Sequence, residues 1–200
     1  MAVGGDRGPQ AGRNTGVTLI YLVQHGEKQR LPGDPGLTPK GRQQATDTGQ
    51  WLRGLGVRAL YSSPLLRARE TAGCIASVTG LAVQLDDRLR ERLNGDGNEP
   101  FDVFLALWAR TTRERGLVPP KGDSSWQAGA RLRAFLTDLP SAPGPAAAVT
   151  HGGITSDLLR DLLGDNALPG YLLDAGIPPC AVTAVDDLKA VMIASTAHLV

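Results

Sequence analysis

The stretch that decides the fold is VTLIYLVQHGEK, residues 17–28. Its first seven residues, Val17 to Val23, form a short apolar run that is partly β-branched, which is typical of a strand buried on both faces. The run stops abruptly at Gln24, His25 and Gly26. Ligands of open α/β sheets bind at the carboxyl ends of the strands, so this segment predicts both the fold class and the place of a site.

The rest of the chain continues this alternation of strands and helices. Further strands are predicted at 57–63, 81–87 (an edge strand), 146–150 and in a hairpin of 180–186 with 190–196. Helices are predicted at 39–56 after an N-cap Thr38, at 64–80, 101–116 and 126–139, the last capped by Ser124 or Ser125, and at 154–164. The pattern predicts a mostly parallel sheet covered by helices on both faces.

Composition narrows the class of protein. The 200 residues carry a formal net charge of +1, so no long-range field draws the chain to nucleic acid or to a membrane. No apolar stretch approaches the roughly 18 residues of a membrane span. The polar, glycine-rich residues 1–16 are expected to be a disordered leader, and residues 17–200 a single domain. The cysteines, Cys74 and Cys180, are expected to be buried thiols in a cytoplasmic protein.

Two of the three histidines stand at predicted strand ends. His25 follows the first strand and His151 follows the strand 146–150, and each precedes a glycine, Gly26 or Gly152, that lets backbone N–H groups approach a ligand. The repeated strand-His-Gly pattern favours a functional role for both. His198, near the C-terminus, is assigned a structural role.

An arginine and a carboxylate complete the candidate site. Arg67 lies one turn into a predicted helix, where the helix dipole favours an anion; the alternative is a surface arginine paired with Glu70. Glu91 lies between arginines in LRERLNGDG, with Asp96 and Glu99 as alternative acids. Two histidines, an arginine and an acid suggest transfer of an anionic group, most simply a phosphoryl group.

Six segments in order carry a family resemblance. They are LVQHGE (22–27), LTPKGRQQA (37–45), LYSSPLLRARETA (60–72), LRERLNGD (89–96), GDSSWQAGARLRAFL (122–136) and VTHGGI (149–154). Together they resemble the histidine phosphatase superfamily, the phosphoglycerate mutase-like proteins, from about Leu19 to His198.

The resemblance implies a three-layer α/β/α sandwich and a phosphohistidine mechanism without a metal or organic cofactor. It implies His25 as the nucleophile, Arg67 as the phosphate clamp, and His151 as a donor to phosphoryl oxygens. Glu91 is implied as the acid that protonates the leaving oxygen and then activates water. Residues expected to contact the phosphate besides Arg67 are Gln24, Gly26 and Gly152.

The chain departs from the family pattern at two positions. Gln24 stands where the family has arginine, and Leu31 stands where many members have asparagine. A neutral donor stabilises a bound anion less than a charged one. Three outcomes stay open: a slow enzyme, an enzyme compensated by Lys28 or Arg30, or a phosphate-binding module without turnover.

The compact chain resembles the shorter, phosphatase-type members. We therefore expect hydrolysis of a small-molecule phosphate ester, with phosphoglycerate mutase-type transfer as the alternative; no nucleic-acid or membrane partner is expected, and a homodimer is left open. The segment 94–116 is expected to cover the pocket. Within it, Arg110, Arg113 and Arg115 are read as a solvated face, with binding of a second acidic group as the alternative. Trp108 and Trp126 are expected in the core.

Overall fold

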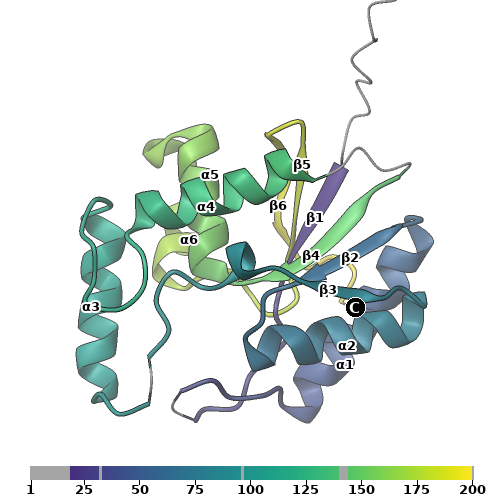
Figure 1. The fold of residues 1–200 in the computed structure, drawn as a ribbon, viewed down its shortest axis with the longest axis horizontal. Helices are drawn as coiled ribbons and strands as arrows, with labels where there is room; N and C mark the ends of the chain where they lie inside the picture. The colour runs from purple at the N-terminus through teal and green to yellow at the C-terminus, as the bar shows by residue number, and fades with distance from the viewer. Residues whose placement is uncertain (1–18, 32, 96, 140–143, 200) are drawn as a thin grey trace, which may run out of the picture.

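A six-stranded sheet organises the molecule. The computed structural model describes residues 19–31, 33–95, 97–139 and 144–199, so the leader expected at 1–16 lies outside the described residues. The strand order is β3-β2-β4-β1-β5-β6, with β1 (Leu19–Gln24) near the middle (Figure 1). The other strands are β2 (Ala59–Ser62), β3 (Val83–Leu85), β4 (Ala146–Thr150), β5 (Val182–Asp186) and β6 (Lys189–Ser195).

The sheet is parallel on one side and antiparallel on the other. β1, β4, β2 and β3 run parallel, and β3 lies at an edge as predicted. β5 runs antiparallel to β1, and β6 pairs with β5 in the predicted hairpin. Asp187 and Leu188 turn this hairpin with φ of 45° and 58°, values typical of a two-residue type I′ turn.

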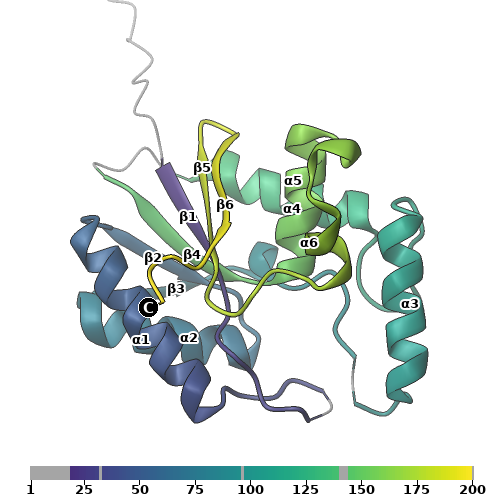
Figure 2. The same cartoon turned by 180° about the vertical axis from the view of Figure 1, so that it is seen from behind.

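Helices cover both faces of the sheet, which confirms the predicted three-layer fold. Figures 1 and 2 show α1 (Pro39–Gly54) and α2 (Leu66–Thr79) on one face and α4 (Ser125–Asp138) and α5 (Gly152–Leu163) on the other. The helix α3 (Phe101–Arg113) stands beside this body, and the short helix α6 (Gly170–Asp174) lies between α3 and the sheet. Two 3₁₀ turns complete the chain, at Asp87–Leu89 and Asp165–Ala167.

The apolar run of β1 supplies two cores because successive side chains point to opposite faces. Ile20 and Leu22 pack with residues of α4 and α5, among them Phe135. Tyr21 and Val23 pack with residues of α1 and α2. A strand apolar at every position therefore fits the middle of the sheet, as its sequence predicts.

Two helices begin two residues away from their predicted starts, and α4 begins one residue early, at Ser125. α2 starts at Leu66 rather than at Pro64, because the Asp34 carboxylate accepts a hydrogen bond from the Leu66 N–H at 2.7 Å. α5 starts at Gly152 rather than at Ile154, because the Glu91 carboxylate accepts the Gly153 and Ile154 N–H groups. Residues distant in sequence supply both caps, so local patterns could not indicate them.

The N-caps of α1 and α4 follow the sequence, whereas α3 ends at Arg113 rather than at Gly116 and β3 spans only Val83–Leu85. Thr38 caps α1, and Ser124 caps α4 in a capping box with Gln127. Two burial predictions are wrong. Trp126 is 60% exposed rather than in the core, because its indole lies over Gly116 at the surface. Cys74 is half-buried rather than buried, whereas Cys180 is buried as expected.

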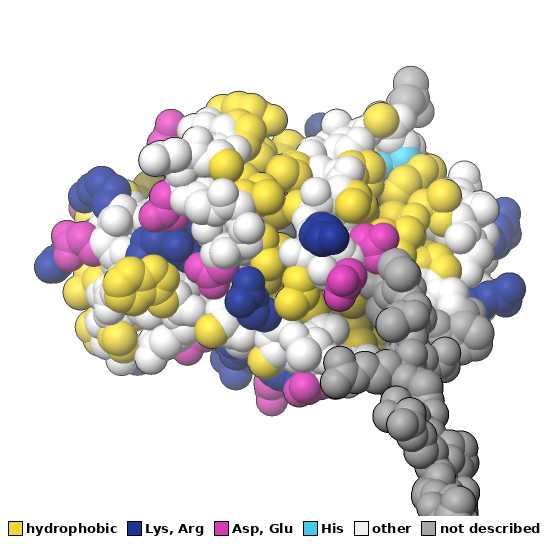
Figure 3. Space-filling view, turned by 90° about the horizontal axis from the view of Figure 1, so that it is seen from above, with side chains coloured by type: hydrophobic (Ala, Val, Ile, Leu, Met, Phe, Trp, Pro, Cys, Tyr) yellow, Lys and Arg dark blue, Asp and Glu magenta, His cyan; other side chains and the backbone are white. Residues whose placement is uncertain are grey.

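The surface agrees with a chain that has little net charge. The face in Figure 3 carries interspersed positive and negative side chains separated by apolar ones. In the part of the chain that the structure describes, no helix has both the length and the apolar character needed to cross a bilayer.

A close backbone contact joins the end of β1 to the start of α1. A Cβ atom at Gly41 would lie 2.1 Å from the Glu27 carbonyl oxygen, and one at Gly26 would lie 2.5 Å from the Gly41 carbonyl oxygen. Only glycine permits this approach, which fixes the segment that follows His25.

Gly41→Ala should therefore lower the free energy of unfolding in urea by about 1–3 kcal/mol, the usual cost of overpacking. Gly54→Ala, in the same helix, is the matched control because a Cβ there meets nothing within 4 Å. The control should be neutral or stabilising by up to about 1 kcal/mol. Equal effects of the two substitutions would show that the contact does not constrain the loop.

Candidate active site

The two histidines predicted as functional lie side by side. Gln24 of β1 pairs in register with Thr150 of β4, so the residues that follow both strands leave the same edge of the sheet. The ring centroids of His25 and His151 are 5.3 Å apart. Both side chains are buried, His25 at 8% and His151 at 0% exposure. The parallel register thus places the two imidazoles in one site.

Hydrogen bonds fix the tautomer of His25. Its Nδ1 lies 2.8 Å from the Gly26 carbonyl oxygen, which can only accept, so Nδ1 carries the proton. Nε2 is then the unprotonated nitrogen of a neutral ring, and the Gln24 amide donates to it from 3.2 Å. The side chain therefore presents a nucleophilic lone pair on Nε2.

The site keeps both rings neutral. Burial, followed by the charge of Arg67, lowers the pKa of His25 to about 3, against the opposing effect of the Gly26 hydrogen bond. Burial, followed by the charge of Arg67, also holds the pKa of His151 well below its usual value. At neutral pH the His25 lone pair is therefore available without removal of a proton.

Arg67 lies beside the histidines and does not pair with Glu70. Its side chain is 6% exposed and its guanidinium donates to the Asp34 carboxylate at 3.0 Å. Glu70 instead pairs with Arg42 and accepts the Leu37 N–H. The alternative of a surface pair between Arg67 and Glu70 is thus wrong, because α2 turns Arg67 inward.

Two buried nitrogen atoms beside His25 lack a partner among the described residues. They are Nε of Arg67 and Nδ1 of His151, whose other nitrogen lies 2.8 Å from the Ser63 hydroxyl. The side-chain oxygen of Gln24, which is an acceptor, also lacks one. Buried polar groups in native proteins are seldom left unpaired. The Arg67 atom is a donor and the His151 atom can be one, so a bound anion would satisfy both.

Glu91 enters the site from the segment that follows β3. Its carboxylate accepts hydrogen bonds from the backbone N–H groups of Arg92 at 2.8 Å, Gly153 at 3.0 Å and Ile154 at 2.9 Å. These bonds fix the side chain at the start of α5, next to His151. Of the alternative acids, Glu99 is exposed and Asp96 lies outside the described residues.

The two glycines differ in what they offer a ligand. Gly26 was expected to bring its N–H to a phosphate, but this N–H donates to the Thr71 hydroxyl at 3.0 Å. Its place is therefore to hold His25 through the carbonyl oxygen, which corrects the prediction. Gly152 is the first residue of α5 and lines the cavity described below. Its N–H precedes the hydrogen-bond ladder of the helix, as a ligand-binding N–H must.

Of the two cations proposed to replace the missing arginine, Lys28 lies closer to the reacting centre. Its charge contributes to lowering the pKa of His25. Desolvation by nearby protein atoms, followed by the charge of Arg67, lowers the pKa of Lys28 itself, although the residue is exposed as a whole. The charge of Arg30 instead acts on Glu27 and lowers its pKa.

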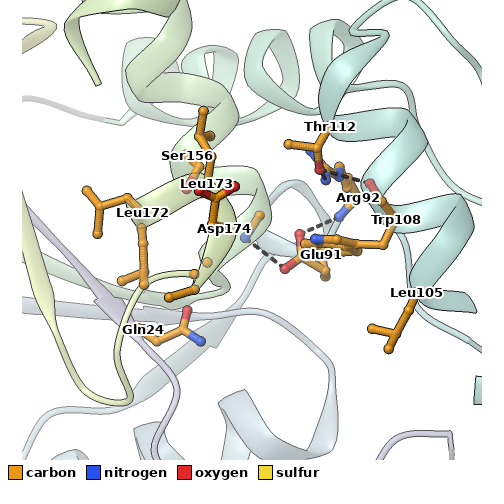
Figure 4. Close-up of a pocket in the computed structure, with 15 residues that line it drawn as sticks. Gln24, Glu91, Arg92, Leu105, Trp108, Thr112, Ser156, Leu172, Leu173 and Asp174 are labelled. Carbon is orange, nitrogen blue, oxygen red and sulfur yellow. Dashed lines mark hydrogen bonds between the residues drawn. The ribbon is translucent and has the colours of Figure 1, made fainter. Parts of the chain in front are cut away.

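A cavity of about 310 Å³ opens beside these residues. Figure 4 shows Gln24 at its base, Glu91 with Arg92 on one wall, and Leu172 to Asp174 on the opposite wall. α3 contributes Leu105, Trp108 and Thr112, which agrees with the expectation that 94–116 covers the pocket. Trp108 was expected in the core, but its half-buried ring lines the cavity because α3 stands apart from the sheet.

Sequence reasoning missed several supporting residues. Arg92 and Asp157 form a buried ion pair behind the cavity, with nitrogen–oxygen distances of 2.8 and 3.1 Å. Ser63 and Thr71 hold His151 and Gly26. The only sequence signal for these contacts was the adjacency of Arg92 to Glu91, because their partners come from other elements.

Comparison with known proteins agrees with this geometry. The histidine phosphatase superfamily (branch 1) matches residues 20–187. A probable phosphoglycerate mutase, GpmB, from Erwinia tasmaniensis is 34% identical over 195 residues, which cover 88% of this chain and 88% of that protein.

Solved structures show the same fold. A mycobacterial glucosyl-3-phosphoglycerate phosphatase in complex with inorganic phosphate is 25% identical, with a TM-score of 0.71 over 90% of this chain and 99% of that chain. A phosphoserine phosphatase from Entamoeba histolytica, with 21% identity and a TM-score of 0.66 over 92% of this chain and 100% of that chain, shares the fold alone. From the family match and these relatives, the chain belongs to the histidine phosphatase superfamily.

Proposed function

We propose that this protein is a phosphomonoesterase that hydrolyses a small phosphorylated metabolite through a phosphohistidine at His25. The observation that carries the proposal is the 2.8 Å contact between Nδ1 of His25 and the Gly26 carbonyl oxygen. It leaves Nε2 as a lone pair on a ring whose pKa is lowered to about 3. A nucleophile that needs no deprotonation is suited to attack on phosphorus.

In the first step, Nε2 of His25 attacks the phosphorus atom and the bond to the leaving oxygen breaks. The Gln24 amide moves from Nε2, which it contacts at 3.2 Å, to a phosphoryl oxygen. Arg67 and His151 donate to the other oxygens through the nitrogens that lack partners among the described residues. Glu91, in its protonated form, gives its proton to the leaving oxygen, and the product alcohol departs.

In the second step, water attacks the phosphorus atom of the phosphohistidine. Glu91, now a carboxylate, accepts a proton from the water as the new oxygen–phosphorus bond forms and the nitrogen–phosphorus bond breaks. Inorganic phosphate leaves and His25 regains its lone pair. The backbone donors that hold Glu91 at the start of α5 keep it in place through both steps.

Mutase-type transfer is the second candidate, favoured by the 34% identity to a probable phosphoglycerate mutase. The two candidates separate on 3-phosphoglycerate, which a mutase converts to 2-phosphoglycerate and a phosphatase converts to inorganic phosphate. The third candidate, a phosphate-binding module, would bind phosphate without releasing it from any ester.

Purified protein should release phosphate from an aryl phosphate, and His25→Ala should abolish the release while circular dichroism shows a folded chain. Glu91→Gln should lower kcat by about 10²–10⁴, the usual contribution of a general acid. Glu99→Gln is the matched control and should be unchanged, because Glu99 is exposed and does not line the cavity.

Absence of phosphate release from wild-type protein would contradict hydrolysis and leave mutase-type transfer and the binding module. Equal losses in Glu91→Gln and Glu99→Gln would contradict the assignment of the acid. Release that persists in His25→Ala would contradict the nucleophile.

The absence of a positive charge at position 24 should limit the rate of hydrolysis. A charged hydrogen bond contributes about 1 kcal/mol more than a neutral one, so Gln24→Arg should raise kcat/KM and phosphate affinity by roughly fivefold to tenfold. Lys28→Ala should act in the opposite direction because the Lys28 charge reaches His25. Steady-state kinetics and phosphate titration by calorimetry measure both effects.

Gln50→Arg is the control, since it adds the same charge to an exposed position on α1. If Gln24→Arg changes neither affinity nor rate, Gln24 does not weaken the site. If Lys28→Ala has no effect, Lys28 does not compensate for the neutral side chain.

A further inference from the structure

The cavity beside His25 lacks a free positive charge among its described lining residues. Its charged members are Glu91, Arg92 and Asp174. Arg92 is 2% exposed, and its two terminal guanidinium nitrogens donate to Asp157 and Thr112, whereas its Nε lacks a partner among the described residues. Its charge is neutralised by the ion pair with Asp157. The same guanidinium lies 4.3 Å from the centroid of the Trp108 ring, and both residues line the cavity.

The arginines that could have bound a second acidic group are engaged elsewhere. Arg110 pairs with Glu114 along α3 at 3.2 Å. Arg115 pairs with Asp161 and Asp165 on the α5 side. Neither of these arginines, nor Arg113, lines the cavity. The alternative raised from the sequence, a second anion bound by these residues, therefore finds no support in their positions.

Unlike the arginines of α3, two acidic residues line the cavity directly. Glu91 is held by backbone N–H groups on one wall of the cavity. Asp174, the last residue of α6, is exposed, lines the opposite wall and forms no ion pair with a described residue. Figure 4 shows the two acids on facing walls. Because Glu91 is protonated when the ester binds in the proposed mechanism, Asp174 is the charge that would repel a carboxylate or second phosphate on the substrate.

The remaining surface is largely apolar. Leu105 and Trp108 from α3 face Leu172 and Leu173 from the opposite wall (Figure 4). Ile177 also lines the cavity. Ser156 of α5 adds a hydroxyl group. Such a lining suits a carbon skeleton with a hydroxyl or amino group better than one with an anion.

We infer that the leaving group of the substrate is an uncharged or cationic alcohol, and that Asp174 excludes alcohols that carry a carboxylate or a second phosphate. This inference rests on the proposed phosphomonoesterase function and specifies its substrate class. It predicts that 3-phosphoglycerate is a poor substrate, because this molecule carries a carboxylate close to its ester.

Two pairs of esters of matched size test the inference. Glycerol 3-phosphate and 3-phosphoglycerate differ by a hydroxymethyl group in place of a carboxylate. Phosphoethanolamine and phosphoglycolate differ by an aminomethyl group in place of a carboxylate. In each pair kcat/KM for phosphate release should be about tenfold or more higher for the member without the carboxylate, a difference of about 1.4 kcal/mol. Equal or reversed preference in both pairs would overturn the inference.

Asp174→Asn should reduce the ratio of the two kcat/KM values in each pair by several-fold, mainly by raising kcat/KM for the ester that carries the carboxylate. The control is Asp187→Asn, which removes the same charge from the β5–β6 turn. This turn lies at the opposite end of the sheet from His25, because Asp186 pairs with Leu19 at the start of β1. If the kcat/KM ratios of Asp174→Asn equal those of the control variant, Asp174 does not have the proposed role.

Binding to His25→Ala protein, measured by calorimetry, tests the same preference without turnover. The dissociation constants of the four esters should follow the order expected for kcat/KM, and the reverse order would overturn the inference. Failure to release phosphate from any ester, the aryl phosphate included, would instead refute the proposed function. The binding order would then still decide whether the cavity excludes anionic leaving groups.

Discussion

The hydrogen bond from Nδ1 of His25 to the Gly26 carbonyl oxygen is the interaction on which the site depends. It fixes the tautomer and turns Nε2 toward Gln24 and the neighbouring His151. The bond needs the backbone at Gly26 to lie against Gly41 at a distance that no side chain permits. The close packing between the end of β1 and α1 therefore helps to determine which ring nitrogen of His25 carries the proton.

Burial and nearby charges then determine the protonation state of the His25 imidazole. Burial alone would favour neutral imidazoles, and the charges of Arg67 and Lys28 act in the same direction on His25. These cations also attract an anion, so the field that keeps the nucleophile neutral is the field that holds a phosphate. Gln24 reduces this field relative to an arginine, and Lys28 supplies part of the difference in the proposed mechanism.

The sequence predicts those parts of the fold and site that depend on local patterns. The apolar run of β1, the cap at Thr38 and the stop at Gly80 all lie where their residues indicate. The contacts of Asp34 with α2 and of Glu91 with α5 were not predictable, because each joins segments far apart in the chain. The cavity lining from Leu172 to Ile177 was missed for a different reason, because α6 is too short to show a helical period.

The most direct test of this account is the protonation of His25 in the resting protein, read from ¹⁵N chemical shifts of labelled imidazoles with His25→Ala for assignment. Because the pKa of His25 is lowered to about 3, the ring should stay neutral from pH 8 down to about pH 5. Its shifts should show the proton on Nδ1 and none on Nε2. A titration near the usual pKa of about 6.5, or a proton on Nε2, would contradict the account.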